Sequence, residues 1–80
     1  MDILRVAILD LLRRKKSEPF SPAEVVQQMY PEDWRHFMED VLLQMMELYQ
    51  EGLLEVTEDD HLVTPNAAPN DRMMIRKRRR

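Results

Sequence analysis

The chain has 80 residues, of which 44% are hydrophobic and 34% are charged, and its formal net charge at neutral pH is −3. This length allows one domain and leaves no room for a second core, while the composition is typical of a chain that folds. Cysteine is absent, which excludes both a disulfide framework and a thiolate metal site.

The N-terminal segment MDILRVAILDLLRRKK has an acidic residue at position 2 and most of its basic residues after the apolar ones. A secretory signal has the opposite polarity. No stretch approaches the ~20 apolar residues that are needed to span a bilayer. We therefore expect a soluble, cytoplasmic protein without a membrane partner.

Charge is distributed unevenly along the chain. Residues 1–71 carry six basic and all fifteen acidic groups, whereas residues 72–80 carry six basic groups and no acidic one. An acidic body with a basic tail is the strongest electrostatic feature of the sequence.

Residues 2–15 are predicted to form a first helix, because their apolar side chains recur at helical spacing. Val6 and Leu9 lie outside the main apolar face, which indicates that the helix is covered on more than one side. Basic residues 13–16 fill its last turn, where cations suit the negative end of the helix dipole. The expected core face consists of Ile3, Leu4, Ala7, Ile8, Leu11 and Leu12.

The segment around Pro19 favours extended backbone, so residues 18–20 are predicted to form a very short strand. SPAE then marks a helix start: Ser21 can cap, Pro22 suits the first helical position, and Glu24 can reach back to the cap. The second helix is predicted to run from about Pro22 to Met29, with Val25, Val26 and Met29 inward.

A third helix is predicted to begin between Pro31 and Trp34 and to end at Glu51, with Gly52 as its left-handed cap. Its periodicity separates a core face from an acidic face. The core face contains Trp34, Phe37, Met38, Val41, Leu42, Met45, Leu48 and Tyr49. The opposite face contains Arg35, His36, Glu39, Asp40, Leu43, Gln44, Met46, Glu47, Gln50 and Glu51.

After Gly52, Leu54 and Val56 alternate with Glu55 and Thr57 at strand spacing. Residues 58–60 are predicted to turn into a short strand at 61–63, and the loop TPNAAPND leads to a last strand within MMIRK. The predicted fold is α+β: a winged helix-turn-helix over residues 1–75, with three helices and a small antiparallel β-hairpin wing. Residues 76–80 are expected to form a basic C-terminal tail.

Three stretches of the chain carry a family resemblance: SPAEVVQQMYPEDWRHFMEDV, the step GLLEVT, and a late TP followed by IR. Together they resemble the pattern of a small bacterial family that is known as a domain of unknown function, the 3253 family. The resemblance covers nearly the whole chain and implies a winged-helix fold, but little about activity. This chain departs from the family pattern at Leu42, where a basic residue is common, and at residues 71–73, where a glycine-proline pair is common. The residues that carry the resemblance are Pro22, Glu24, Val25, Trp34, Arg35, Met38, Val41, Leu48, Gly52, Val56, Pro65 and Arg76.

Nucleic-acid binding with a regulatory role is the leading functional hypothesis, in which the wing and the tail bind phosphates. The third helix is too acidic to contribute more than a few polar contacts, and Arg35 could instead pair with Glu24. A basic tail that only keeps an acidic protein soluble remains an alternative. The expected contacts with DNA are Arg35, His36, Gln44, Arg72, Arg76, Lys77, Arg78, Arg79 and Arg80.

The alternative function is a protein-interaction module or a homodimer seam on the acidic face of the third helix. Its expected contact residues are Leu43, Met46, Glu39 and Glu47, because a neighbouring apolar pair that includes a methionine suits a protein contact. Catalysis is not expected, since the sequence shows no arrangement of nucleophile, base and oxyanion hole. No cofactor, metal or small-molecule substrate is expected, and the acidic residues 58–61 are best explained as a hairpin turn.

Overall fold

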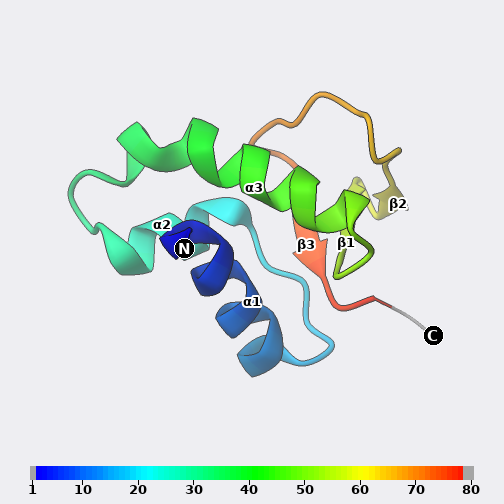
Figure 1. Cartoon of the computed structure of the whole chain (residues 1–80), viewed down its shortest axis with the longest axis horizontal. Helices are drawn as coiled ribbons and strands as arrows, with labels where there is room; N and C mark the ends of the chain where they lie inside the picture. The colour runs from blue at the N-terminus through cyan, green and yellow to red at the C-terminus, as the bar shows by residue number, and fades with distance from the viewer. Residues whose placement is uncertain (1, 79–80) are drawn as a thin grey trace.

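The computed structural model describes residues 2–78, and within them three α-helices precede a three-stranded antiparallel sheet (Figure 1). This arrangement confirms the predicted α+β class. The helices are α1 (Ile3–Lys15), α2 (Pro22–Met29) and α3 (Met38–Gln50), with a 3₁₀ helix, η1 (Trp34–Phe37), before α3. The strands are β1 (Glu55–Glu58), β2 (His61–Leu62) and β3 (Met74–Arg76).

Side-chain caps fix the starts of the first two helices. An Asp2 carboxylate oxygen accepts the backbone N–H of Leu4 at 2.9 Å, and the Ser21 hydroxyl accepts that of Glu24 at 3.3 Å. The Glu24 side chain does not reach back to the cap as expected, nor does it pair with Arg35. Its carboxylate lies 3.6 Å from the Lys15 ammonium instead, so it links α2 to the end of α1.

The third predicted helix is divided in two. Residues 31–33 form a turn, and the His36 N–H donates to the Asp33 carbonyl at 2.9 Å, a bond of 3₁₀ type. Asp33 makes no capping hydrogen bond with its side chain. The α-helical bonding pattern therefore begins only at Met38, later than predicted.

Gly52 ends α3 in the predicted left-handed conformation, with φ of +80°. Its N–H donates to the Tyr49 carbonyl and the Leu53 N–H donates to the Leu48 carbonyl, both at 3.0 Å. These two bonds form a Schellman motif, which satisfies carbonyls that the last helical turn leaves unpaired. The chain then reverses direction into β1.

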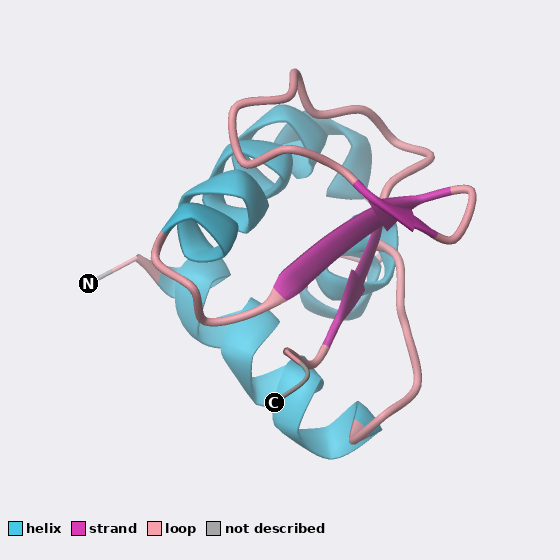
Figure 2. Ribbon diagram, turned by 90° about the vertical axis from the view of Figure 1, so that its right-hand side faces the viewer, coloured by secondary structure: helices cyan, strands magenta, loops and turns pink. Residues whose placement is uncertain are grey.

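The core lies where the three helices meet one face of the sheet (Figure 2). Three residues depart from the predicted pattern. Ile3 was expected in the core but is 62% exposed, whereas Met46 and Thr57 were expected outside it but are 5% and 4% exposed. The buried apolar residues are Leu4, Ile8, Leu11, Leu12, Phe20, Val25, Val26, Val41, Met45, Met46, Leu48, Leu54, Val56, Met73 and Ile75.

β1 is the central strand, and the order of the sheet is β2-β1-β3. Asp59 and Asp60 both have positive φ at the β1–β2 turn, as a tight type I′ hairpin turn requires. The strand predicted at 18–20 is reduced to one bridge, in which Phe20 exchanges two backbone hydrogen bonds with Ile75 at 2.9 and 2.7 Å. This bridge holds the segment after α1 beside β3.

The loop between β2 and β3 arches over the C-terminal half of α3 (Figure 1). The Tyr49 hydroxyl donates to the Val63 carbonyl at 2.5 Å, and the Gln50 amide donates to the Pro65 carbonyl at 3.0 Å. α3 therefore contacts the loop as well as α1, α2 and β1, which explains why Met46 is buried on a face predicted to be open.

Replacing Gly52 with alanine should destabilise the fold by about 1–2 kcal/mol, because a residue with a Cβ is strained at positive φ. The added Cβ would also lie 3.1 Å from the Arg78 guanidinium. Urea denaturation of the wild type, Gly52→Ala and Gly52→Asn would test this prediction. Asparagine tolerates the left-handed region, so Gly52→Asn should lower the free energy of unfolding less than Gly52→Ala does. Equal stability of all three proteins would contradict the prediction.

Candidate nucleic-acid interface

The polar residues that were expected on the third helix do not gather into one surface. Arg35 lies over the Trp34 ring, with its guanidinium carbon 4.5 Å from the ring centroid. Arg35 and Gln44 line different hollows, and His36 is exposed in η1. Glu39, Asp40 and Glu47 are exposed along α3. Phosphates would meet an acidic helix here, so this face favours no nucleic-acid contact.

Two of the basic residues that were expected to bind phosphates already pair with acidic residues of β1. Arg76 lies opposite Glu55 in the β1–β3 register, and its Nε donates to the carboxylate at 2.8 Å with both side chains largely buried. Arg72 pairs with Glu58 at 3.1 Å. Arg76 is also the last residue of β3 rather than the first residue of the tail. Both pairs lower the positive charge that this sheet offers to a polyanion.

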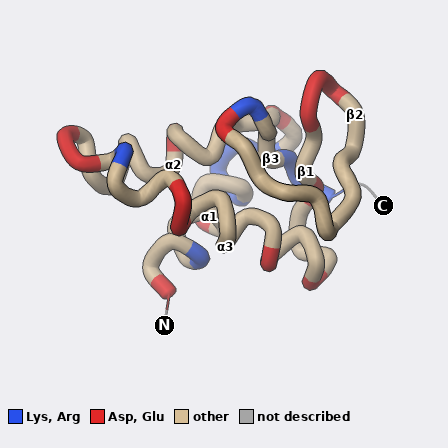
Figure 3. The backbone as a smooth tube through the Cα atoms, turned by 90° about the horizontal axis from the view of Figure 1, so that it is seen from above, with Lys and Arg blue, Asp and Glu red and all other residues tan. Residues whose placement is uncertain are grey.

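The tip of the β1–β2 hairpin is acidic, because Asp59 and Asp60 form its turn (Figure 3). A wing that enters a groove of DNA normally brings cations towards the phosphate backbone. The hairpin tip of this chain would bring two carboxylates instead. Any phosphate contact therefore has to come from elsewhere.

The structure brings together two basic segments from opposite ends of the chain. Arg13, near the end of α1, lines one groove with Lys77 and Arg78, which follow β3. A second hollow, with a volume of about 340 Å³, is lined by Ser17, just after α1, again by Lys77 and Arg78, and also by the acidic Asp60. The Phe20–Ile75 bridge causes this approach, since it aligns the backbone segments that lead to each basic run.

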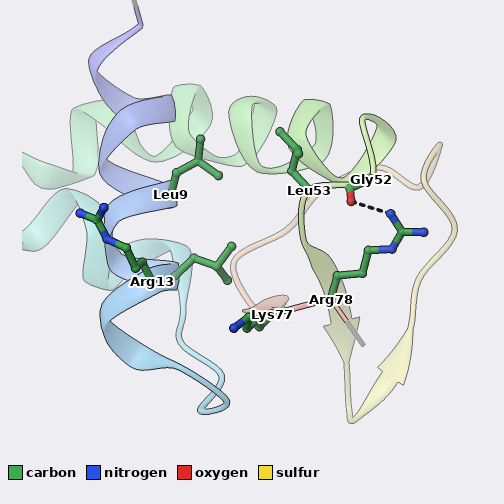
Figure 4. A pocket seen from close by; sticks show the side chains of 7 residues that line it. Leu9, Arg13, Gly52, Leu53, Lys77 and Arg78 are labelled. Carbon is green, nitrogen blue, oxygen red and sulfur yellow. Dashed lines mark hydrogen bonds between the residues drawn. The ribbon is translucent and has the colours of Figure 1, made fainter. Parts of the chain in front are cut away.

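The larger groove has a volume of about 610 Å³ and an apolar lining of Leu9, Leu12 and Leu53. Figure 4 shows Leu9 and Leu53 on opposite sides, with Lys77 beside α1. Arg78 donates to the Gly52 carbonyl at 3.0 Å, which holds the start of the tail at the rim. Arg13 points its guanidinium away from Leu53 (Figure 4) and binds Asp10 at 2.8 Å.

Most cations of the described chain are neutralised by a carboxylate. Asp10 binds Arg13 and Arg14, and Lys15 pairs with Glu24. Among residues 2–78, the cations without an ion pair are Lys16, Arg35, Lys77 and Arg78. Lys77 and Arg78 line the groove beside α1, and Lys16 is the C-cap residue of that helix. Arg79 and Arg80, which were also expected to bind phosphates, lie outside the described residues.

The sequence pattern explains the basic residues 13–16 only by the helix dipole, and it does not predict that Arg13 lines a groove with Lys77 and Arg78. No local pattern could reveal it, because the two runs are at opposite ends of the chain. The approach could have been predicted only from the pairing of Phe20 with Ile75. The sequence does not show this pairing, because one apolar residue after a proline does not specify a strand partner.

The comparisons with known proteins identify a family without naming an activity. The family described as "Protein of unknown function (DUF3253)" matches residues 1–79. The chain belongs to this family. Among curated proteins, no match was found. Membership in DUF3253 confirms the family resemblance seen in the sequence, and it leaves the function to be argued from the site.

Other site types find little support in the described part of the chain. No group of three or more histidine, aspartate or glutamate side chains within residues 2–78 is placed to hold a metal ion. No helix in that range is long and apolar enough to cross a membrane. Within residues 2–78, the groove between α1 and the residues after β3 brings together Arg13, Lys77 and Arg78, and it is the clearest candidate site.

The one pair with shifted pKa values joins α1 to the end of α3. Arg5 donates two hydrogen bonds to the Glu51 carboxylate, at 2.5 and 2.7 Å. The hydrogen bond from Arg5 lowers the pKa of Glu51, and the same bond raises the pKa of Arg5. Both side chains are partly exposed, so solvent screens the interaction and its effect on stability is small.

Because the folded-state pKa of Glu51 lies below its unfolded value, the pair stabilises the fold above the unfolded-state pKa. This contribution is lost as the pH falls through the folded-state pKa. Glu51→Gln should therefore be slightly less stable than the wild type at neutral pH, with a difference that shrinks on acidification. Thermal denaturation across this pH range would measure it. Glu32→Gln, an exposed control without an ion pair, should lack this pH-dependent difference; a constant difference for Glu51→Gln would contradict the assignment.

Proposed function

We propose that this DUF3253 chain is a non-enzymatic, winged-helix-like domain that binds nucleic acid through its phosphates and acts in regulation. The observation that carries the proposal is that Lys77 and Arg78 line one groove with Arg13 of α1, and that neither Lys77 nor Arg78 has an ion-pair partner among residues 2–78. The tail continues from this point with Arg79 and Arg80. Cations without a carboxylate partner attract the phosphate backbone irrespective of base sequence.

The order of elements supports the winged-helix part of the proposal. Three helices are followed by a hairpin, and a third strand pairs on the other side of β1. In a winged helix, α3 would occupy the recognition position. Here the exposed Glu39, Asp40 and Glu47 oppose that role. We therefore assign binding to phosphate contacts at the end of β3, with little discrimination between base sequences.

Replacing Lys77, Arg78, Arg79 and Arg80 together with glutamine should abolish most binding to a short DNA duplex. Fluorescence anisotropy against salt concentration would measure the affinity. Each lost phosphate contact lowers the slope of log affinity against log salt by about 0.9, so four lost contacts would lower it by about 3.6. This variant keeps Arg76, and therefore the buried pair with Glu55.

The matched controls are single changes to basic residues that are engaged elsewhere. Arg72→Gln removes a residue that is paired with Glu58, and Arg35→Gln removes the residue stacked on Trp34. Both should leave the salt slope nearly unchanged. If the wild type shows no binding at low salt, the proposal fails. If Arg35→Gln weakens binding more than the tail variant does, the interface lies on η1 and α3 instead.

A second candidate function is protein contact through the acidic face of α3, and the exposure of Leu43 favours it. Leu43 is 52% exposed, and Glu39 and Glu47 lie one turn away on either side, both exposed. Met46 no longer belongs to this surface, because it is buried in the core. A fitting partner would surround an apolar side chain with lysine or arginine.

Leu43→Glu should abolish binding of a basic amphipathic helical peptide, used as the probe, because a carboxylate would replace the central apolar contact. Isothermal titration calorimetry would measure binding, and circular dichroism should show an unchanged fold. Leu62→Glu, at an exposed apolar residue of β2, is the matched control and should bind the peptide normally. Equal binding by both variants would exclude Leu43 as the contact.

A further inference from the structure

The outward face of α1 carries apolar side chains that the described part of the chain leaves open. Val6 is 48% exposed, and Leu9 is partly exposed. At 100° per residue, Val6 lies opposite the buried face formed by Leu4, Ile8, Leu11 and Leu12. A helix with apolar residues on both of its faces is normally covered on both. The fold of this chain supplies only one of these two covers.

The residues along this outer face follow an ordered pattern. Asp2, Val6, Leu9 and Arg13 are separated by four, three and four positions, which places them in one line along the helix. The line is acidic at its start, apolar in its middle and basic at its end. Asp2 and Arg13 are both exposed. We call these four residues the α1 seam.

Neighbouring apolar residues widen the seam at both ends. Leu53 is 45% exposed and shares the larger groove with Leu9, as Figure 4 shows. At the other end, the exposed Ile3 and Leu43 line one hollow of about 410 Å³. The exposed large apolar residues of the described chain are Ile3, Val6, Leu43, Leu53 and Leu62. All except Leu62 therefore adjoin the seam, and such clustering marks an interaction surface.

We propose that the occupant of this surface is a second copy of the chain, with its α1 packed antiparallel against the first. In a twofold interface, each contact occurs twice with the partners exchanged. Antiparallel packing centred between Val6 and Leu9 places Val6 against Leu9 of the second copy. It also places Asp2 against Arg13 of the second copy, where Asp2 would join or replace the exposed Asp10 partner of Arg13.

Charge selects this orientation over the parallel one. Parallel packing would bring Asp2 against Asp2 and Arg13 against Arg13, and like charges facing one another oppose association. Residues beside the seam add further negative charge at its acidic end and positive charge at its basic end. Asp40 lines the hollow at the acidic end of the seam, and Lys77 lines the groove at its basic end. The antiparallel dimer therefore joins an acidic end to a basic end twice.

The seam is short, and stable protein interfaces usually bury at least about 1,200 Å² in total. We therefore expect a dimer that dissociates on dilution rather than an obligate one. The proposal does not rest on nucleic-acid binding, although Leu9 and Arg13 of the seam line the same groove as Lys77 and Arg78 of the proposed phosphate site. Self-association is measured without nucleic acid, so either proposal can fail alone.

Sedimentation equilibrium of the full chain over a range of concentrations tests the dimer. The wild type should show a reversible monomer–dimer equilibrium. Val6→Glu should lower the association constant about tenfold or more, because it places an unpaired carboxylate in the apolar centre. Leu62→Glu makes the same change at an exposed residue away from the seam and should leave association unchanged. A wild type that stays monomeric, or a Val6→Glu variant that associates normally, would overturn the proposal.

The antiparallel register has a separate test in a pair of charge reversals. Asp2→Lys and Arg13→Glu should each weaken self-association, since each brings like charges together at both ends of the seam. An equal mixture should restore association, because lysine at position 2 then faces glutamate at position 13 and the unchanged residues face each other. Asp2→Lys also removes the helix cap of α1, and circular dichroism would monitor this effect. A lost cap could weaken association, but mixing the two variants would not reverse it. A mixture that associates no better than its components would overturn the register.

Discussion

The backbone pairing of Phe20 with Ile75 is the constraint on which the rest of the structure depends. Two hydrogen bonds at 2.9 and 2.7 Å join these residues, and both side chains are fully buried. Ile75 also lies opposite Val56 in the β1–β3 register. One residue of β3 thus connects the segment after α1 to the central strand. Without this closure, the basic end of α1 and the basic tail would not share a surface.

Local signals in the sequence predicted the elements well, because each depends on neighbouring residues alone. Ser21 and Pro22 set the start of α2, and Gly52 set the end of α3 through a conformation that strains other residues. The same local logic failed at Trp34–Phe37. Over so few residues, apolar spacing does not distinguish a 3₁₀ helix from an α-helix, and Asp33 offers no side-chain cap to begin one.

Burial was less predictable than secondary structure, because it depends on how many neighbours an element has. The periodicity of α3 predicted one core face, yet the helix is contacted by α1, α2, β1 and the long loop, so Met46 is enclosed as well. Thr57 is buried because β1 is the central strand. Conversely, Ile3 is exposed because α1 packs on its own chain along one face only. The apolar residues on the outer face of α1 predict a second cover, and within the described chain Val6 is left 48% exposed.

The candidate site was harder to predict than the fold. A basic side chain attracts phosphate strongly only where no carboxylate of the same chain neutralises it. The sequence shows six basic residues after position 71, but not that Arg76 faces Glu55 across the sheet or that Arg72 meets Glu58. Cross-strand register decides which charges cancel, and register follows from tertiary packing.

The helix α1 has a different role on each of its surfaces. One face packs in the core, and the α1 seam forms the proposed dimer contact. Its basic end contributes to the proposed phosphate surface. In an antiparallel dimer these basic ends lie at opposite ends of the seam. While the dimer persists, two phosphate-binding surfaces would lie at opposite ends of the helix pair, which is an arrangement suited to one long polyanion rather than to a small anionic ligand.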